Sequence, residues 1–253
     1  MSDSPSPLYM QRMLVSTPGL MELGRRRRLP LRDTDIGYLV HCFLGELCGD
    51  DAPGPFAVSG SHGRFTEILA YTERTADEHR RYADSFAEPN VHAGCDWDRF
   101  DQKRLPSDWP ARTRLGFRVR VCPVVRTASD GPKRRKGAEV DAFLARCSKA
   151  AENDVIEREA VYREWFEGQV NRHGGASLLR LGIDSFKLDR VVRRSQGNTR
   201  KSVVGQRPDV TMTGIFEVTD SSQFTALLRR GIGRHRAFGF GMLLLLPVEN
   251  GSC

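Results

Sequence analysis

Alternation of apolar and polar residues predicts four strands and two helices in the first half of the chain. In order, they are a strand at 8–16, a helix from about 35 to 47, strands at 56–59 and 64–72, a helix at 75–86 and a strand at 114–126. This strand–helix–strand–strand–helix–strand order is that of a ferredoxin-like domain. We therefore predict a first domain over 1–127, with the irregular stretch 88–110 packed on it as loop.

The second half of the chain predicts a similar succession of elements over 128–253. Residues 129–137 are turn-rich and basic, so we expect a linker or a hairpin tip there. After it come helices at 140–147 and 161–173, strands at 178–192 and 210–218, a helix capped by Asp220 and a closing strand at 240–246. Because the closing strand is apolar on both faces, we expect it in the centre of a sheet.

Composition narrows the class of protein. The formal net charge is +7 and 39% of residues are hydrophobic, which suffices for a packed core. Arginine greatly outnumbers lysine, and guanidinium groups favour bidentate contact with phosphate and stacking on bases, so the bias points to nucleic acid. Four adjacent arginines at 25–28 repel one another unless a polyanion neutralises them, which favours phosphate contact over a solvated turn.

The six cysteines form no CxxC pair and have no spacing suited to zinc. We therefore expect reduced thiols, no metal and no cofactor. The first residues lack the basic and apolar regions of a signal peptide, and no apolar run approaches the roughly 20 residues of a membrane helix. These features predict a cytoplasmic protein without a membrane partner.

A stretch from Gly231 to Gly241 combines four glycines with Arg234, His235 and Arg236. Glycines permit tight turns and close approach to a ligand, and basic side chains beside exposed amides form a phosphate cradle. A solvated glycine-rich turn is the alternative. The stretch lacks the Gly-Lys-Ser/Thr of a P-loop, and Arg236 stands where a dinucleotide fingerprint needs its third glycine, so it does not fit an ATP or NAD site.

Tyr38 and His41 lie three residues apart on the helix predicted at 35–47, and so share one flank. Histidine exchanges protons near neutral pH because its ordinary pKa is about 6.5. A single histidine on a helix is nevertheless more often structural than catalytic.

Residues 227–244 resemble the C-terminal glycine-rich loop of CRISPR repeat-processing endoribonucleases, in particular the CasE (Cse) branch of the RAMP superfamily. Further support comes from the opening strand LYMQRMLV at 8–15, from Tyr38-x-x-His41 and from residues 214–220. The resemblance implies an α+β fold with two tandem ferredoxin-like (RRM-like) domains, which agrees with the predicted element order.

The resemblance also implies a function. A member of this group binds the repeat hairpin of precursor CRISPR RNA and cleaves it by metal-independent attack of a ribose 2′-hydroxyl, giving a cyclic phosphate and a 5′-hydroxyl. It then keeps the mature RNA and joins other subunits of a CRISPR effector complex. His41 and Tyr38 occupy the positions of the catalytic histidine and tyrosine, and an arginine such as Arg28 would stabilise the phosphorane.

On the same basis we expect the basic loops to hold the RNA stem by shape and backbone, with Tyr38 and His41 across a groove from the glycine-rich loop. The expected RNA-binding residues are Arg25, Arg26, Arg27, Lys133, Arg134, Arg135, Lys136, Arg193, Arg194, Arg200, Lys201, Gly231, Gly233, Arg234, His235, Arg236, Gly239 and Gly241. Two alternatives stay open. An arginine dominates catalysis instead of His41, or the protein is a non-catalytic CRISPR RNA-binding subunit.

Overall fold

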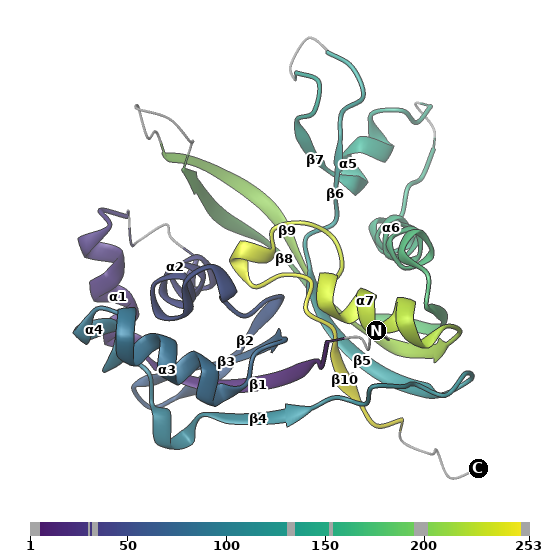
Figure 1. The fold of residues 1–253 in the computed structure, drawn as a ribbon. Coiled ribbons are helices and arrows are strands. Elements are labelled where there is room, and N and C mark those ends of the chain that lie inside the picture. The colour runs from purple at the N-terminus through teal and green to yellow at the C-terminus, as the bar shows by residue number, and fades with distance from the viewer. Residues whose placement is uncertain are drawn as a thin grey trace.

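The computed structural model describes residues 6–29, 31, 35–130, 135–151, 154–194 and 202–248, without the side chains of 190–204. Two antiparallel four-stranded sheets lie end to end, and helices pack on them (Figure 1). None of the helices in these ranges has the length and apolar content needed to span a membrane.

The first sheet has the strand order β2-β3-β1-β4. Its strands are β1 (Tyr9–Ser16), β2 (Phe56–His62), β3 (Phe65–Thr72) and β4 (Asp101–Arg104), and its helices are α1 (Thr17–Arg26), α2 (Ile36–Cys48), α3 (Ala76–Phe86) and the short α4 (Pro89–His92). One helical segment follows β1 and another follows β3, and β4 returns beside β1. This is the predicted ferredoxin-like arrangement.

The second sheet repeats that arrangement with the order β10-β5-β9-β8. Its strands are β5 (Arg114–Val121), β8 (Ala176–Arg194), β9 (Ser202–Val218) and β10 (Leu244–Leu246). Helix α6 (Arg158–His173) lies in the connection from β5 to β8, and α7 (Ser221–Arg230) lies in the connection from β9 to β10. A small hairpin of β6 (Val124–Arg126) and β7 (Glu139–Asp141), followed by α5 (Ala142–Cys147), is inserted after β5. The chain therefore forms two ferredoxin-like domains in tandem.

The strand predicted at 114–126 does not complete the first sheet. It breaks at Pro123, which has no N–H to donate to a ladder, and its first part, β5, pairs with β9 and β10 in the second sheet. The fourth strand of the first sheet is instead β4, within the stretch 88–110 predicted as loop. From this sheet membership we propose that the second domain begins between Arg104 and Arg114, before residue 128.

The prediction of a central closing strand is also wrong. Strand β10 lies at the edge of the second sheet and pairs only with β5. The residues before it are apolar because they pass between the two sheets, where the Tyr71 hydroxyl donates to the Leu243 carbonyl at 2.7 Å. A segment that is apolar on both faces can lie between two domains or in the centre of a sheet. Sequence periodicity alone does not distinguish these two positions.

The arginine cluster at 25–28 begins inside a helix, not in a loop. Helix α1 starts where the Ser16 hydroxyl accepts from the Gly19 N–H, and it buries Leu20 and Leu23. Arg25 and Arg26 form its last turn. Cations are favourable at a helix C-terminus, where carbonyls carry partial negative charge.

Helix α2 contacts the segment between α7 and β10, which is drawn in yellow beside it in Figure 1. Asp35 caps the helix by accepting from the Gly37 N–H at 2.7 Å. A Cβ built on Gly37 would lie 2.2 Å from the Phe238 carbonyl oxygen, whereas one on Gly45 would meet nothing within 4 Å. Gly37 thus permits a close backbone contact between the helix and this segment.

This contact predicts opposite effects for two glycine-to-alanine substitutions in one helix. Gly45→Ala should raise the free energy of unfolding by about 0.5–1 kcal/mol, because alanine favours a helix over glycine. Gly37→Ala should lower it by about 1–3 kcal/mol, because the added methyl group overpacks the contact. Urea denaturation of both variants measures the difference. Equal stabilisation by the two substitutions would show that the segment does not rest on α2.

Candidate nucleic-acid interface

The glycine-rich loop, residues 231–241, connects α7 to the chain that leads into β10. Its two ends meet, because the Ile232 N–H donates to the Gly241 carbonyl at 2.8 Å. Gly231 and Gly241 have φ of +68° and +88°, and a Cβ on Gly241 would lie 2.3 Å from the Ile232 carbonyl oxygen. These two glycines are therefore required to close the loop itself, independently of any ligand.

One side of the loop packs on α2. The Phe238 ring stacks on Tyr38, with centroids 5.3 Å apart, and Tyr38 lies 6.1 Å from the His41 ring. Gly239 lies against Phe56 at the same side. The structure thus brings Tyr38 and His41 together as predicted. It also shows Tyr38 in contact with the loop, so the expectation of a groove between them is wrong for Tyr38.

His41 is exposed at the surface beside Arg27. Its pKa is lowered, first by the protein atoms that displace part of its water and second by the positive charge of Arg27. At neutral pH the imidazole is therefore mainly unprotonated. An accessible neutral imidazole can accept a proton from a bound hydroxyl.

Arg25, Arg26 and Arg27 of the arginine cluster pair with glutamates, so a polyanion is not needed to neutralise them. Arg25 pairs with Glu22 at 3.0 Å and Arg27 with Glu46 at 2.6 Å. Arg26 pairs with Glu88 and lies 3.8 Å from Glu46. Arg28 follows the helix with φ of +53° and is exposed. Because all four remain at the surface, they are still available to phosphate at the cost of these weak ion pairs.

Arg120 connects the glycine-rich loop, α2 and the second sheet. Its guanidinium donates twice to Asp209, at 2.9 Å each, and lies 3.4 Å from Asp35, the cap of α2. It also donates to the Phe238 carbonyl at 3.3 Å and lies 4.1 Å from the centroid of the Phe240 ring. The sequence gives no sign of these partners, which come from three distant segments.

The carboxylates in this cluster are deeply buried, with 7% of the Asp35 side chain and 4% of the Asp209 side chain exposed. Burial raises the pKa of Asp35, and the charge of Arg120 and the Gly37 N–H oppose that change. Burial would lower the pKa of Arg120, but the carboxylates of Asp209 and Asp35 outweigh it and raise that pKa. The guanidinium is therefore fully charged and balances acids that would otherwise be costly to bury.

Two basic residues of the loop bind a single carboxylate. Glu139 on β7 accepts from Arg234 at 2.8 Å and lies 3.0 Å from His235. The close approach of the His235 imidazole is the main reason that the pKa of Glu139 falls to about 2, and Arg234 lowers it further against the effect of burial. This pairing attaches the loop to the β6–β7 hairpin.

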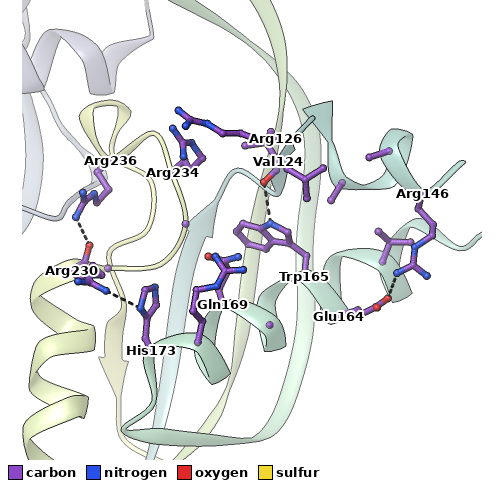
Figure 2. Close-up of a pocket in the computed structure, with 18 of the residues that line it drawn as sticks. Val124, Arg126, Arg146, Glu164, Trp165, Gln169, His173, Arg230, Arg234 and Arg236 are labelled. Carbon is purple, nitrogen blue, oxygen red and sulfur yellow. Dashed lines mark hydrogen bonds and ion pairs between the residues drawn. The ribbon is translucent and has the colours of Figure 1, made fainter. Parts of the chain in front are cut away.

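The other side of the loop borders a cleft of about 750 Å³ that the sequence did not indicate (Figure 2). Helix α6 forms the opposite wall, with Trp165, Gln169 and His173. Gly233 lies against the Trp165 ring. The cationic side chains that line the cleft are Arg126, Arg146, Lys149, Arg172, Arg230, Arg234 and Arg236. They come from five segments of the chain, so their spacing in the sequence did not predict that they gather around one cleft.

The remaining predicted RNA-binding residues that the structure describes lie beside two pairs of strands, β6–β7 and β8–β9. Arg135 and Lys136 are exposed beyond the β6–β7 pair, and Arg193 and Arg194 end β8, opposite Val203 and Ser202 of β9. Arg193 and Arg194 therefore lie at the end of a strand that pairs with β9. Lys133, Arg134, Arg200 and Lys201 lie outside the described residues, as do the side chains of Arg193 and Arg194.

Within the described ranges, no group of three or more His, Cys, Asp and Glu side chains is placed to hold a metal ion. The cysteines Cys42, Cys48, Cys95 and Cys122 are buried as free thiols, and Cys147 is exposed. Burial raises the pKa of the Cys48, Cys95 and Cys122 thiols to about 12, so they are unreactive core residues.

The geometry defines a protein of tandem ferredoxin-like domains with a basic cleft beside a glycine-rich loop. A family model described as "CRISPR associated protein" matches residues 13–247. The chain belongs to this family of CRISPR-associated proteins. No curated protein sequence matches it.

Several solved structures share its fold. The CRISPR endoribonuclease Cse3 bound to a 19-nucleotide RNA is 20% identical, with a TM-score of 0.61, and the alignment covers 95% of this chain and 100% of that one. Thermus thermophilus Cse3 bound to an RNA that represents a pre-cleavage complex is 17% identical, with a TM-score of 0.59 and the same coverage. Cas6e of Escherichia coli K-12 is 16% identical, with a TM-score of 0.59 and again the same coverage.

Removal of the Arg120 charge should strongly destabilise the fold. Arg120→Ala leaves Asp35 and Asp209 buried without their main counter-ion, and we expect a loss of about 3 kcal/mol in the free energy of unfolding. Arg118→Ala, on the exposed face of the same strand, should cost less than about 0.5 kcal/mol. Guanidinium denaturation compares the two. Similar small losses for both would mean that Arg120 does not hold the junction.

The low pKa of Glu139 predicts a contribution to stability in acid. Because the folded-state pKa is about 2 and the ordinary value is 4.5, this contribution is present above pH 4.5 and is lost as the pH falls toward 2. Glu139→Gln should therefore lower stability at pH 6 and flatten its decline between pH 4.5 and 2. Urea midpoints measured across that range provide the readout.

The matched control is Glu159→Gln, which removes an exposed carboxylate that pairs only with Arg163 one helical turn away. Such surface pairs contribute little, so the acid dependence of this variant should remain that of the wild type. An unchanged acid decline in Glu139→Gln would contradict the role of this cluster.

Proposed function

We propose that this protein is a CRISPR RNA-binding and RNA-processing endoribonuclease. Membership of the CRISPR-associated family supports this function. So does the shared fold with Cse3, whose solved structures are described as a CRISPR endoribonuclease bound to RNA. The observation that carries the proposal is His41, an exposed histidine with a lowered pKa on the helix that supports the glycine-rich loop.

In the finer proposal, the substrate is the repeat hairpin of precursor CRISPR RNA and His41 is the general base. Neutral His41 takes the proton of the ribose 2′-hydroxyl, and the 2′-oxygen forms a bond to the adjacent phosphorus. The bond from phosphorus to the 5′-oxygen breaks, and that oxygen gains a proton. The products are a 2′,3′-cyclic phosphate and a 5′-hydroxyl.

Arginines beside His41 supply the charge stabilisation that this transition state needs. Arg27 is the nearer one, because its charge acts directly on the His41 pKa, and Arg28 follows it on the same surface. The Tyr38 ring stacks on Phe238 and thereby fixes the face of α2 that carries His41. The proposed reaction uses no metal ion, and the product RNA stays bound and enters an effector complex.

A second function is favoured by one observation. Phe238 stacks on the Tyr38 ring, with centroids 5.3 Å apart, and so covers a face of the predicted catalytic tyrosine. A tyrosine packed in this way suits a non-catalytic CRISPR RNA-binding subunit. A hairpin with a 2′-deoxy sugar at the scissile position is bound but cannot be cleaved by this mechanism. An endoribonuclease therefore cleaves the ribose hairpin and only binds the deoxy hairpin, whereas a non-catalytic subunit binds both and cleaves neither.

His41→Ala should reduce hairpin cleavage by roughly 10²–10⁴-fold in single-turnover assays, because the general base is lost. Addition of EDTA to the wild type should have no effect. His62→Ala removes another exposed histidine, on β2, and should cleave at the wild-type rate. Full activity of His41→Ala, or inhibition by EDTA, would contradict the mechanism.

The pH profile tests the same role independently. If neutral His41 is the base, the cleavage rate rises with pH through a pKa below 6.5 and then levels off. Arg27→Gln removes a positive charge that lowers this pKa, so the midpoint should move to higher pH. A rate that falls with increasing pH through this range would assign His41 as the general acid instead.

A further inference from the structure

The cleft between the glycine-rich loop and α6 is strongly positive. Of its described lining residues, seven are Arg or Lys and only Glu164 is acidic, and Glu164 already pairs with Arg146 at 2.6 Å. Arg126, Lys149 and Arg172 are exposed and form no ion pair with any described residue. Like charges gathered in a concave surface concentrate a positive potential and attract anions.

The chemistry of the lining points to phosphates as the groups recognised. Guanidinium groups bind phosphate in a bidentate manner. Two aromatic rings line the described cleft wall, and both are engaged by the protein. Trp165 is only 9% exposed and its indole N–H donates to the Val124 carbonyl, and His173 is partly buried and lies 3.1 Å from the Arg230 guanidinium. A cleft with many cations and no fully exposed aromatic ring favours a sugar–phosphate backbone irrespective of base sequence.

The size of the cleft limits what enters. A volume of about 750 Å³ falls within the range of small-molecule pockets, roughly 300–1,000 Å³. This space accommodates a few nucleotides of one strand and is too small for the paired stem of a hairpin. The expected occupant is therefore single-stranded.

The glycine-rich loop joins this cleft to the proposed catalytic site. Gly231, Gly233, Arg234 and Arg236 line the cleft, whereas Phe238 stacks on Tyr38 next to His41. A strand that leaves a scissile phosphate near His41 thus has only to cross the loop to reach the cleft. Arg236 is held at the crossing by its bond to the Arg230 carbonyl at 2.8 Å (Figure 2).

We propose that this cleft binds the phosphates of a single-stranded RNA segment that flanks the hairpin. The inference rests on the proposed function for the identity of the RNA. It adds Arg126, Lys149 and Arg172, which sequence analysis did not assign to RNA, and it assigns the cleft side of the glycine-rich loop to the flanking strand instead of the stem. It predicts that the protein prefers a hairpin with an unpaired extension to the hairpin alone.

The test measures binding of a 2′-deoxy, uncleavable repeat hairpin by fluorescence anisotropy, with and without a short oligouridine extension on either side. One extension should tighten binding to the wild type by about tenfold, as expected for several phosphate contacts. The triple variant Arg126→Ala, Lys149→Ala, Arg172→Ala should lose this gain and still bind the blunt hairpin within about twofold. Its slope of log K against log salt should fall by about 2, since each single-strand phosphate contact contributes about 0.7.

A matched control removes the same number of exposed cations elsewhere. Lys103 and Arg104 on β4 and Arg118 on β5 are exposed and do not line the cleft. Their triple alanine variant should keep the full gain from the extension. A complementary strand annealed to the extension should abolish the gain, because the resulting duplex does not fit the cleft.

The inference would be overturned if the cleft variant kept the gain, or if the annealed extension bound equally well. No gain in the wild type would also overturn it, and would leave an acidic protein segment as the occupant to test. Failure of the proposed function looks different. In that case a hairpin with an intact 2′-hydroxyl is not cleaved, and the extension still binds through Arg126, Lys149 and Arg172.

Discussion

The junction of the two domains depends on the charge of Arg120. A partly buried guanidinium that binds Asp209, Asp35 and the Phe238 carbonyl fixes three segments at once: a strand of the second sheet, the start of α2 and the glycine-rich loop. Since buried carboxylates are costly without a counter-ion, these segments are stable only in this mutual arrangement. The position of His41 relative to the loop is thus set by the charges of largely buried side chains.

Local physics explains how much of the fold could be predicted from sequence. Helix α2 has a cap residue, Asp35, and a periodic apolar stripe, and the polar helix α3 begins at the capping box of Thr75, so the predicted limits of both helices were close to those observed. Strand β4 was missed because all four of its residues are exposed, which leaves no alternation to detect. Strand β10 was misplaced because burial between domains produces the same apolar run as burial in a sheet.

Some features of the candidate site could likewise be predicted from the sequence, and others could not. Tyr38 and His41 are three residues apart on one helix, so their proximity followed from helical geometry. The partners of Arg120 and the cations of the cleft are brought together by tertiary structure alone, and no spacing rule relates Arg126 to Arg172 or Arg234. The glycines were predicted to permit tight turns and close approach to a ligand. The structure shows that Gly231 and Gly241 serve to close the loop itself.

The unequal packing of the two sides of the glycine-rich loop predicts unequal evolutionary constraint on them. On the α2 side, Phe238 touches both Tyr38 and Gly37, so a change at any one of them needs a compensating change in the others. On the cleft side, exposed cations such as Arg172 can be exchanged without disturbing the core. Relatives should therefore show covariation among the first set and drift among the second, which would let RNA preference diversify while the cleavage geometry is inherited unchanged.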